Sequence, residues 1–128
     1  GLSIAQAASM KSGYPIVGVD ITDKKLRMGK LFGLTHAFSA SSDDLHGEIR
    51  EIVGSAGADV VIETTGNSRV IEKAYKLTHK EGKTIILVTH SEEVAERAQR
   101  VVHMKDGLIE SDTILPESPS RRKAQATK

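Results

Sequence analysis

Short, mostly apolar runs separated by helical patterns constrain the fold of this chain more than any other feature. The runs 16–19 (IVGV), 60–63 (VVIE) and 84–88 (TIILV) have the length and hydrophobicity of strands buried on both faces of a parallel sheet. A shorter strand is predicted at 36–39, and helical patterns lie between the runs. This alternation predicts an α/β fold with a three-layer, Rossmann-like, doubly wound and mainly parallel sheet.

Residues that suit helix and hairpin ends set the expected boundaries. The chain opens on a helix over 2–12, and later helices are expected to begin at one of these capping residues: Thr22 or Asp23, Ser41 or Ser42, Asn67 or Ser68, and Ser91. A strand at 100–104, a Lys-Asp-Gly turn and a return strand from 108 predict a C-terminal antiparallel hairpin. We therefore expect one domain over 1–115 and, from its Pro, Ser, Arg, Lys and Gln content, a disordered tail over 116–128.

Composition excludes several partners. A net charge of +1 and an aromatic content of 3% argue against a nucleic-acid partner. No apolar run approaches the roughly 20 residues that cross a bilayer, so no membrane partner is expected and the cytoplasm is the expected location. The absence of cysteine excludes disulfides and thiolate metal sites. The spacing of His36, His46, His79 and His103 predicts no metal site.

Four features of residues 1 to about 78 resemble one family in order and spacing. They are the strand and acid 16-IVGVD-20, Lys25, the phrase 33-GLTHAFS-39, and 57-GADVVIETTGN-67. Together they resemble the dinucleotide-binding domain of zinc-type medium-chain alcohol dehydrogenases. The resemblance implies that Asp20 accepts hydrogen bonds from both hydroxyls of the adenosine ribose and favours NAD over NADP.

The resemblance also implies roles for five other residues. Lys25 matches a second ribose contact, Thr64, Thr65 and Gly66 match the loop beneath the adenine, and Gly1 matches the last glycine of G-x-G-x-x-G. Without the resemblance, Asp20 would be interpreted as a turn or cap residue, Lys25 as a solvated lysine, and the two threonines as loop hydrogen-bonding groups.

The chain departs from that family at its beginning. The first strand and the first two glycines of the fingerprint are absent, and so is the catalytic domain with its cysteine and histidine zinc ligands. We therefore expect a domain without a catalytic residue, which requires no cofactor and binds NAD weakly at most. A missing central strand leaves a gap. We expect it to close with the strand at 16–20 beside the strand at 60–63, which in the family's strand numbering gives the order 3-2-4-5-6 plus the hairpin strand. A homodimer formed by strand exchange is the alternative.

The second half is similar to another family. The stretch KEGKTIILVTHSEEVAERAQRVVHMKDGLIESD resembles the carboxyl end of an ABC transporter ATP-binding subunit. The resemblance implies that His90 is the switch histidine, with Glu63 near the place of the catalytic glutamate. Because the chain lacks a P-loop and the LSGGQ signature, ATP hydrolysis is not expected. The interpretation we favour is a strand-end histidine hydrogen-bonded to nearby backbone.

The two resemblances together predict an engineered or recombined chimera. Its dehydrogenase-like part would cover 1–78 and its ABC-like part 79–115, with the join between Leu77 and Thr84. The alternatives are a fragment of an NAD-dependent zinc-type alcohol dehydrogenase that needs missing parts, and an ABC-type ATP-binding fragment.

Overall fold

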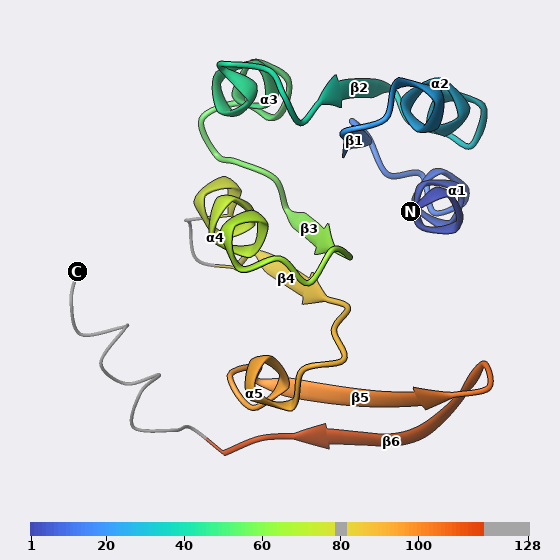
Figure 1. Ribbon diagram of the computed structural model, residues 1–128, viewed down its shortest axis with the longest axis vertical. Helices are drawn as coiled ribbons and strands as arrows, with labels where there is room; N and C mark the ends of the chain where they lie inside the picture. Colours follow the sequence, from blue (N-terminus) through green and yellow to red (C-terminus); the bar gives the residue numbers. More distant parts are fainter. Residues whose placement is uncertain (79–81, 117–128) are drawn as a thin grey trace. The chain divides into compact units, whose positions relative to one another are not determined.

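The computed structural model describes residues 1–78 and 82–116 of the chain (Figure 1). Its contacts divide the chain into two compact units, residues 1–87 and 88–128. The predicted disordered tail, from residue 117 on, and His79 lie outside the described residues. The elements are α1 (Leu2–Met10), β1 (Val17–Asp20), α2 (Asp23–Leu31), β2 (His36–Ser39), α3 (Leu45–Val53), β3 (Val60–Glu63), α4 (Ser68–Leu77), β4 (Thr84–Leu87), α5 (Glu92–Ala95), β5 (Arg100–Lys105) and β6 (Leu108–Ile114).

The first parallel pair, β1 and β2, is built around small residues. Its register begins with Val17 opposite His36, and α2 forms the crossover that a parallel pair requires. A Cβ atom at Gly18 of β1 would lie 2.3 Å from Cδ1 of Leu34, and one at Gly29 of α2 would lie 2.4 Å from the same atom. Leu34 therefore fills the space that these two glycines leave between helix and strand.

The second parallel pair, β3 and β4, is covered by a helix on one face. Val60 lies opposite Thr84, and α4 contacts both strands. The alternate residues Val60, Ile62 and Ile86 are 37–52% exposed, whereas Glu63 is buried. Since successive side chains of a strand point to opposite faces, α4 covers the face that includes Glu63.

Three of the four predicted caps are found where the sequence placed them, and one is not. Thr22, Asn67 and Ser91 stand at the N-cap positions of α2, α4 and α5, although the Thr22 side chain makes no capping hydrogen bond. The prediction of Ser41 or Ser42 for α3 is wrong. The cap is Asp44, whose carboxylate accepts a hydrogen bond from the Gly47 N–H at 3.1 Å. Asp44 directly precedes the first turn, where the negative charge of a carboxylate also interacts favourably with the positive end of the helix dipole.

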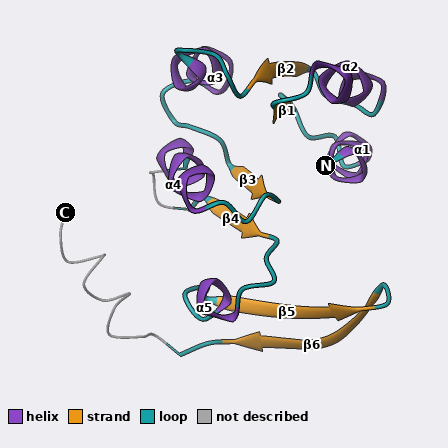
Figure 2. Ribbon diagram, in the orientation of Figure 1, coloured by secondary structure: helices purple, strands orange, loops and turns teal. Residues whose placement is uncertain are grey.

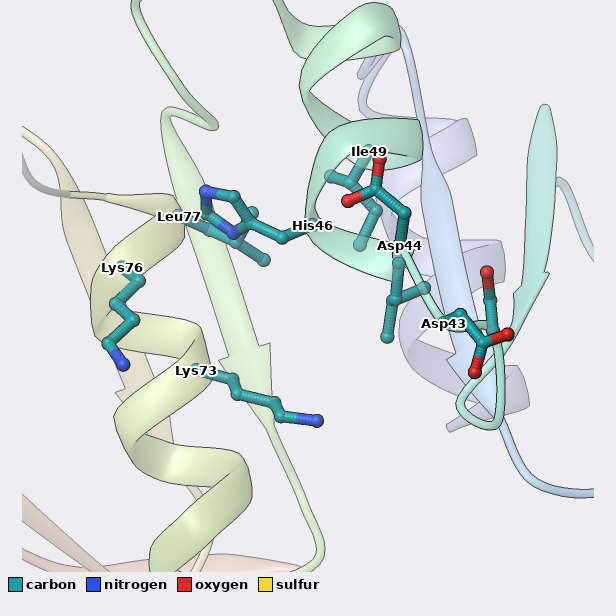
Figure 3. A pocket seen from close by; sticks show the side chains of 9 residues that line it. Asp43, Asp44, His46, Ile49, Lys73, Lys76 and Leu77 are labelled. Carbon is teal, nitrogen blue, oxygen red and sulfur yellow. The ribbon is translucent and has the colours of Figure 1, made fainter.

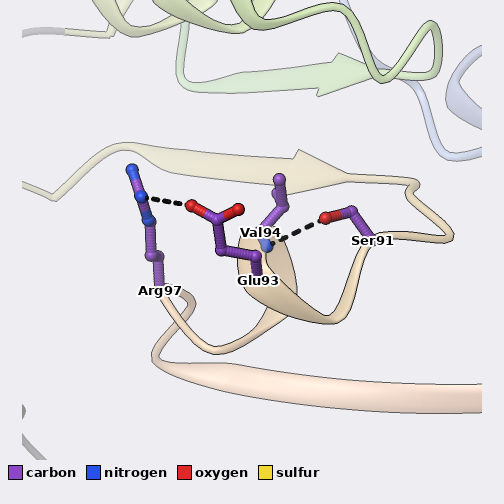
Figure 4. Close-up of polar contacts among 4 residues, drawn as sticks. All are labelled: Ser91, Glu93, Val94 and Arg97. Carbon is purple, nitrogen blue, oxygen red and sulfur yellow. Dashed lines mark hydrogen bonds and ion pairs between the residues drawn. The ribbon is translucent and has the colours of Figure 1, made fainter.

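In the unit over residues 88–128, the described residues form the short helix α5 and a hairpin. Figure 4 shows the Ser91 side chain accepting a hydrogen bond from the Val94 N–H at 3.4 Å, and the ion pair of Glu93 with Arg97 at 2.8 Å. After Ala95 the chain continues in a tighter i→i+3 turn, in which the N–H of Arg97 bonds the carbonyl of Val94.

The predicted hairpin of β5 and β6 is confirmed. Lys105 lies opposite Leu108, and the two residues between them have positive φ, 51° for Asp106 and 79° for Gly107. Positive φ at both central positions defines the type I′ turn that Asp-Gly favours.

Backbone hydrogen bonds join the described strands in three separate pairs, β1–β2, β3–β4 and β5–β6 (Figure 2). The predicted closure of β1 against β3 is therefore wrong for the described residues. Helices α2 and α4 hold the parallel pairs, whereas α3, which connects them, makes only slight contacts with other described elements. No local packing thus brings β1 beside β3, and strand exchange between two copies stays a prediction.

The α/β class, the parallel pairing and the C-terminal antiparallel hairpin are as predicted from the sequence. Among the described residues, the buried apolar side chains are small in number: Ala5, Ile49 and Ala74. No helix in the described part of the chain has both the length and the apolar character needed to span a membrane.

Candidate nucleotide-binding site

Asp20 ends β1 and presents a partly open carboxylate. Its Oδ1 accepts a hydrogen bond from the Thr22 N–H at 2.8 Å, which is the turn contact that the simpler interpretation of Asp20 predicted. Its Oδ2 lies 3.8 Å from Lys25 Nζ, beyond hydrogen-bond distance, and the two side chains are 31% and 66% exposed. The bond to Oδ1 thus orients the carboxylate. Oδ2 faces the solvated Lys25 ammonium, and a ligand hydroxyl can bond Oδ2 beside that ammonium or in its place.

Glu63 ends β3 and holds the loop that follows it. Its Oε1 accepts hydrogen bonds from the N–H and the hydroxyl of Thr65 at 2.6 and 2.5 Å, and its Oε2 accepts one from the Gly66 N–H at 3.1 Å. The hydroxyl oxygen of Thr65 in turn accepts a hydrogen bond from the Asn67 N–H at 3.1 Å. Thr64, Thr65 and Gly66, the predicted adenine loop, are therefore exposed residues on a turn fixed by a buried carboxylate.

The sequence interpretation missed this role of Glu63. It related Glu63 to the place of a catalytic glutamate and assigned the loop hydrogen bonding to the threonines alone. The signal was present as an acid followed directly by Thr-Thr-Gly-Asn, since hydroxyl groups and free backbone N–H groups near a carboxylate form local turns.

Gly1 precedes α1, where the resemblance placed the end of a phosphate-binding turn. Its carbonyl accepts hydrogen bonds from the N–H groups of Ile4 and Ala5, both at 3.1 Å, so it is the N-cap residue of the helix. The first turn of α1 contains no acidic residue that would repel an anion. The positive end of the α1 dipole therefore has the charge that attracts a phosphate, and no nearby acidic side chain opposes it.

His90 lies just after β4, in the second unit, and is exposed. The interpretation that it bonds nearby backbone is wrong, because no hydrogen bond of His90 is found among the described residues. The neighbouring Thr89 bonds nearby backbone instead, since its hydroxyl oxygen accepts a hydrogen bond from the Ser91 N–H at 3.0 Å.

A cavity of about 300 Å³ lies elsewhere in the first unit (Figure 3). Asp43, Asp44 and His46 line it from the start of α3, and Lys73 and Lys76 line it from α4. The residues lining this cavity in the described chain include none of those predicted to contact NAD. The cavity is therefore separate from the candidate site.

Comparisons with known proteins agree with the first resemblance. The sequence matches the zinc-binding dehydrogenase family over residues 1–114. An NAD-dependent alcohol dehydrogenase of Sulfurisphaera tokodaii is 32% identical over 68% of this chain and 25% of its own length. The crystal structure of benzyl alcohol dehydrogenase from Acinetobacter calcoaceticus matches 72% of this chain and 25% of that one, at 25% identity and a TM-score of 0.64. The fold is therefore Rossmann-like, as predicted.

A transporter protein is also similar to this chain. The macrolide export ATP-binding/permease protein MacB of Chlorobium luteolum is 32% identical over 93% of this chain and 20% of its own length. This similarity supports the ABC-like part of the prediction. The dehydrogenase match nevertheless runs past residue 79 to residue 114, so the junction near residue 78 stays a prediction.

The chain spans between 20% and 25% of the lengths of these three proteins. Residues 1–78 and 82–116 contain no group of three or more His, Cys, Asp or Glu placed to hold a metal ion, so the described residues do not fit a zinc site. The donor set around Asp20 does fit a ribose. By its sequence match over residues 1–114 and by its fold, the chain belongs to the zinc-binding dehydrogenase family.

Proposed function

We propose that this chain is a nucleotide-binding domain that holds NAD weakly through Asp20, Lys25 and the loop 64–66 and that catalyses no reaction by itself. The observation that carries the proposal is the Asp20 carboxylate, which is oriented by the Thr22 N–H and is 31% exposed at the carboxyl end of a parallel strand. Ligands of open α/β sheets bind at the carboxyl ends of the strands.

The chemistry of this pair of side chains suits a ribose. The carboxylate can accept hydrogen bonds from two vicinal hydroxyls, and the Lys25 ammonium 3.8 Å away can donate one to a ribose oxygen. A 2′-phosphate would place like charge against Asp20, so NADP is disfavoured. The similarity to a protein named as an NAD-dependent alcohol dehydrogenase supports the same cofactor.

The diphosphate has weaker support than the ribose. The positive end of α1 attracts an anion, but the 128 residues contain no G-x-G-x-x-G sequence that would let the backbone approach both phosphates. We therefore expect a Kd for NAD weaker than about 1 μM, a binding free energy smaller than about 8 kcal/mol. When bound, NAD would supply hydride chemistry, for which these residues provide binding and orientation only.

The proposal is tested by titrating the isotopically labelled chain with NAD, NADP and ATP and following backbone amide signals. We expect saturable shifts near Asp20 and Thr65 with NAD, and weaker ones with NADP. Asp20→Asn should reduce the preference for NAD over NADP by about tenfold, which corresponds to about 1.4 kcal/mol for the loss of one charged contact. Asp23→Asn, which changes an acid in the first turn of α2, is the matched control.

Two results would contradict the proposal. One is the absence of a saturable shift at Asp20 and Thr65 with NAD. The other is ATP turnover that disappears in His90→Ala, which would favour the ABC-type alternative.

A further inference from the structure

We propose that Glu63 is a positioning residue that sets the backbone conformation of the loop 64–66 for contact with the nucleotide. The inference rests on the proposed function for its link to NAD, whereas the effect on the loop itself can be observed without any ligand. Glu63 would not touch the nucleotide and would act only through Thr65 and Gly66.

The burial of Glu63 contrasts with the exposure of the loop. The residue is 4% exposed, whereas Thr64, Thr65, Gly66 and Asn67 are all exposed. Both carboxylate oxygens are used, and all the hydrogen bonds go to residues of this loop. A buried acid whose described side-chain hydrogen bonds all go to an exposed turn is placed to shape that turn.

The hydrogen bonds continue from Glu63 to the start of α4. The Asn67 N–H donates to the Thr65 hydroxyl oxygen at 3.1 Å, and the Arg69 N–H donates to the Asn67 side-chain oxygen at 3.0 Å. Between them, Gly66 has a φ of +68°, in the left-handed region that few residues adopt. The turn is therefore fixed at both ends, by Glu63 at the end of β3 and by Asn67 at the N-cap of α4.

The partners of Glu63 require an acceptor at both of its oxygens. Two of them are backbone N–H groups and the third is the Thr65 hydroxyl, which donates to Glu63 while it accepts from Asn67. An ionised carboxylate only accepts hydrogen bonds, so it matches this set. The amide of glutamine would direct an NH₂ group at either Gly66 or Thr65 and leave an N–H group without its acceptor.

Glu63→Gln is therefore the informative variant, because it preserves the size of the side chain. Without ligand, we expect the amide signals of Thr65, Gly66 and Asn67 to shift, and the exchange protection of Thr65 and Gly66 to fall about tenfold. The Thr22 amide in the Asp20 turn should be unchanged. The Kd for NAD should rise at least fivefold. Glu72→Gln, an exposed acid on α4 paired with Lys76, is the matched control and should change neither measurement.

A second pair of variants tests the same network if Glu63→Gln does not fold. Thr65→Val removes the hydroxyl that links Glu63 to Asn67 at an exposed position, and Thr65→Ser keeps it. We expect the valine variant to reproduce the loop shifts and the serine variant to restore the parent spectrum. A purely steric function of Thr65 would give the opposite order, because valine preserves its shape better.

The outcomes separate this inference from the proposed function. If Glu63→Gln and Thr65→Val keep the parent protection and shifts of the loop, the positioning role is overturned, whether or not NAD binds. If the loop changes but the Kd for NAD stays at its parent value, the link between loop geometry and nucleotide binding is overturned. If the parent chain shows no NAD binding, the proposed function fails while the effect on the loop is still measured.

Discussion

Two parallel strands of this protein end in an acid, and the two carboxylates have opposite surroundings. At the end of β1, Asp20 accepts one hydrogen bond from nearby backbone and its side chain is 31% exposed. At the end of β3, Glu63 accepts three hydrogen bonds and is 4% exposed. An acid at a strand end is therefore not by itself a ligand contact. The donors in the residues that follow determine whether its oxygens are consumed locally or remain available.

The largest expected effect comes from changing the glycine that precedes β3, the strand that ends in Glu63. Gly57, before β3, has a φ of +74°, and a Cβ atom there would lie 2.4 Å from the carbonyl oxygen of Leu77, which already accepts a hydrogen bond from the Ala58 N–H at 3.1 Å. Gly57→Ala adds strain to a backbone clash, so we expect a loss of about 3 kcal/mol in the free energy of unfolding. Urea unfolding followed at the amides of β3 and of β1 measures it.

Gly107→Ala is the control for this prediction. Gly107 has a similar φ of +79°, but a Cβ atom there would meet nothing within 4 Å. We expect a loss of about 1 kcal/mol, from backbone strain alone. Equal losses for the two variants would show that the approach to Leu77 is unimportant, and a loss of protection at Thr22 with Gly57→Ala would show that the two acid turns are not independent.

A second prediction compares the replacement of each of the two acids by alanine. Glu63→Ala leaves the N–H groups of Thr65 and Gly66 without their acceptor and should destabilise the chain by about 2 kcal/mol. Asp20→Ala removes one hydrogen bond at a partly exposed turn and should cost about 0.5 kcal/mol, while it lowers the preference for NAD over NADP. Urea unfolding and NAD titration of both variants give the comparison. Equal destabilisation would mean that Asp20, too, is mainly structural.

The sequence predicted the elements better than it predicted how they assemble. The strand bounds 36–39 and 60–63 agree with the structure, because Gly, Ser, Thr and Asp residues that favour turns and caps flank both segments. The cap of α3 was missed since Ser-Ser-Asp-Asp offers four competing capping side chains in a row. The pairing of β1 with β2 is as predicted, but its pairing with β3 was mispredicted, because strand pairing depends on contacts between distant residues, which no local pattern specifies.

The site shows the same limit. The sequence located Asp20 and the Thr64–Gly66 loop as positions, but a linear pattern does not show which of two strand-end acids turns inward. That choice depends on burial by α4, which covers the Glu63 face of β3. The predicted contacts of Asp20, Lys25 and the loop with a nucleotide stay predictions until the titration is done.

The smallest expected effect concerns a third acid, Asp112 on β6, which is held by a side chain. Arg100 on β5 donates to both of its oxygens, from Nε to Oδ1 at 2.7 Å and from Nη2 to Oδ2 at 2.5 Å. The hydrogen bonding and charge of Arg100 lower the pKa of Asp112, although desolvation opposes the shift. The same hydrogen bond and the charge of Asp112 raise the pKa of Arg100.

The sign of the pH dependence follows from the lowered pKa of Asp112. A carboxylate with a lower pKa in the folded state stabilises that state above its unfolded value of about 3.9, and the contribution is lost as the pH falls through the folded value. We therefore expect the β5–β6 amides to lose a little protection as the pH falls below about 4. Asp112→Asn should remove this pH dependence. Arg100→Lys should weaken it, because lysine keeps the charge but lacks the two-pronged donor geometry.

The effect should be small because both side chains are in solvent, where ion pairs contribute little to stability, and it should decrease further with added salt. Asp112 therefore tests the rule drawn from Asp20 and Glu63 at the acid where the expected effect is smallest. Asp20, Glu63 and Asp112 all accept hydrogen bonds, and the cost of removing each should follow burial and the number of backbone donors rather than the number of contacts. Asp112→Asn could instead destabilise the chain as much as Glu63→Ala. Two hydrogen bonds from an exposed arginine would then contribute as much stability as three hydrogen bonds to a buried acid, and burial would not be the deciding factor.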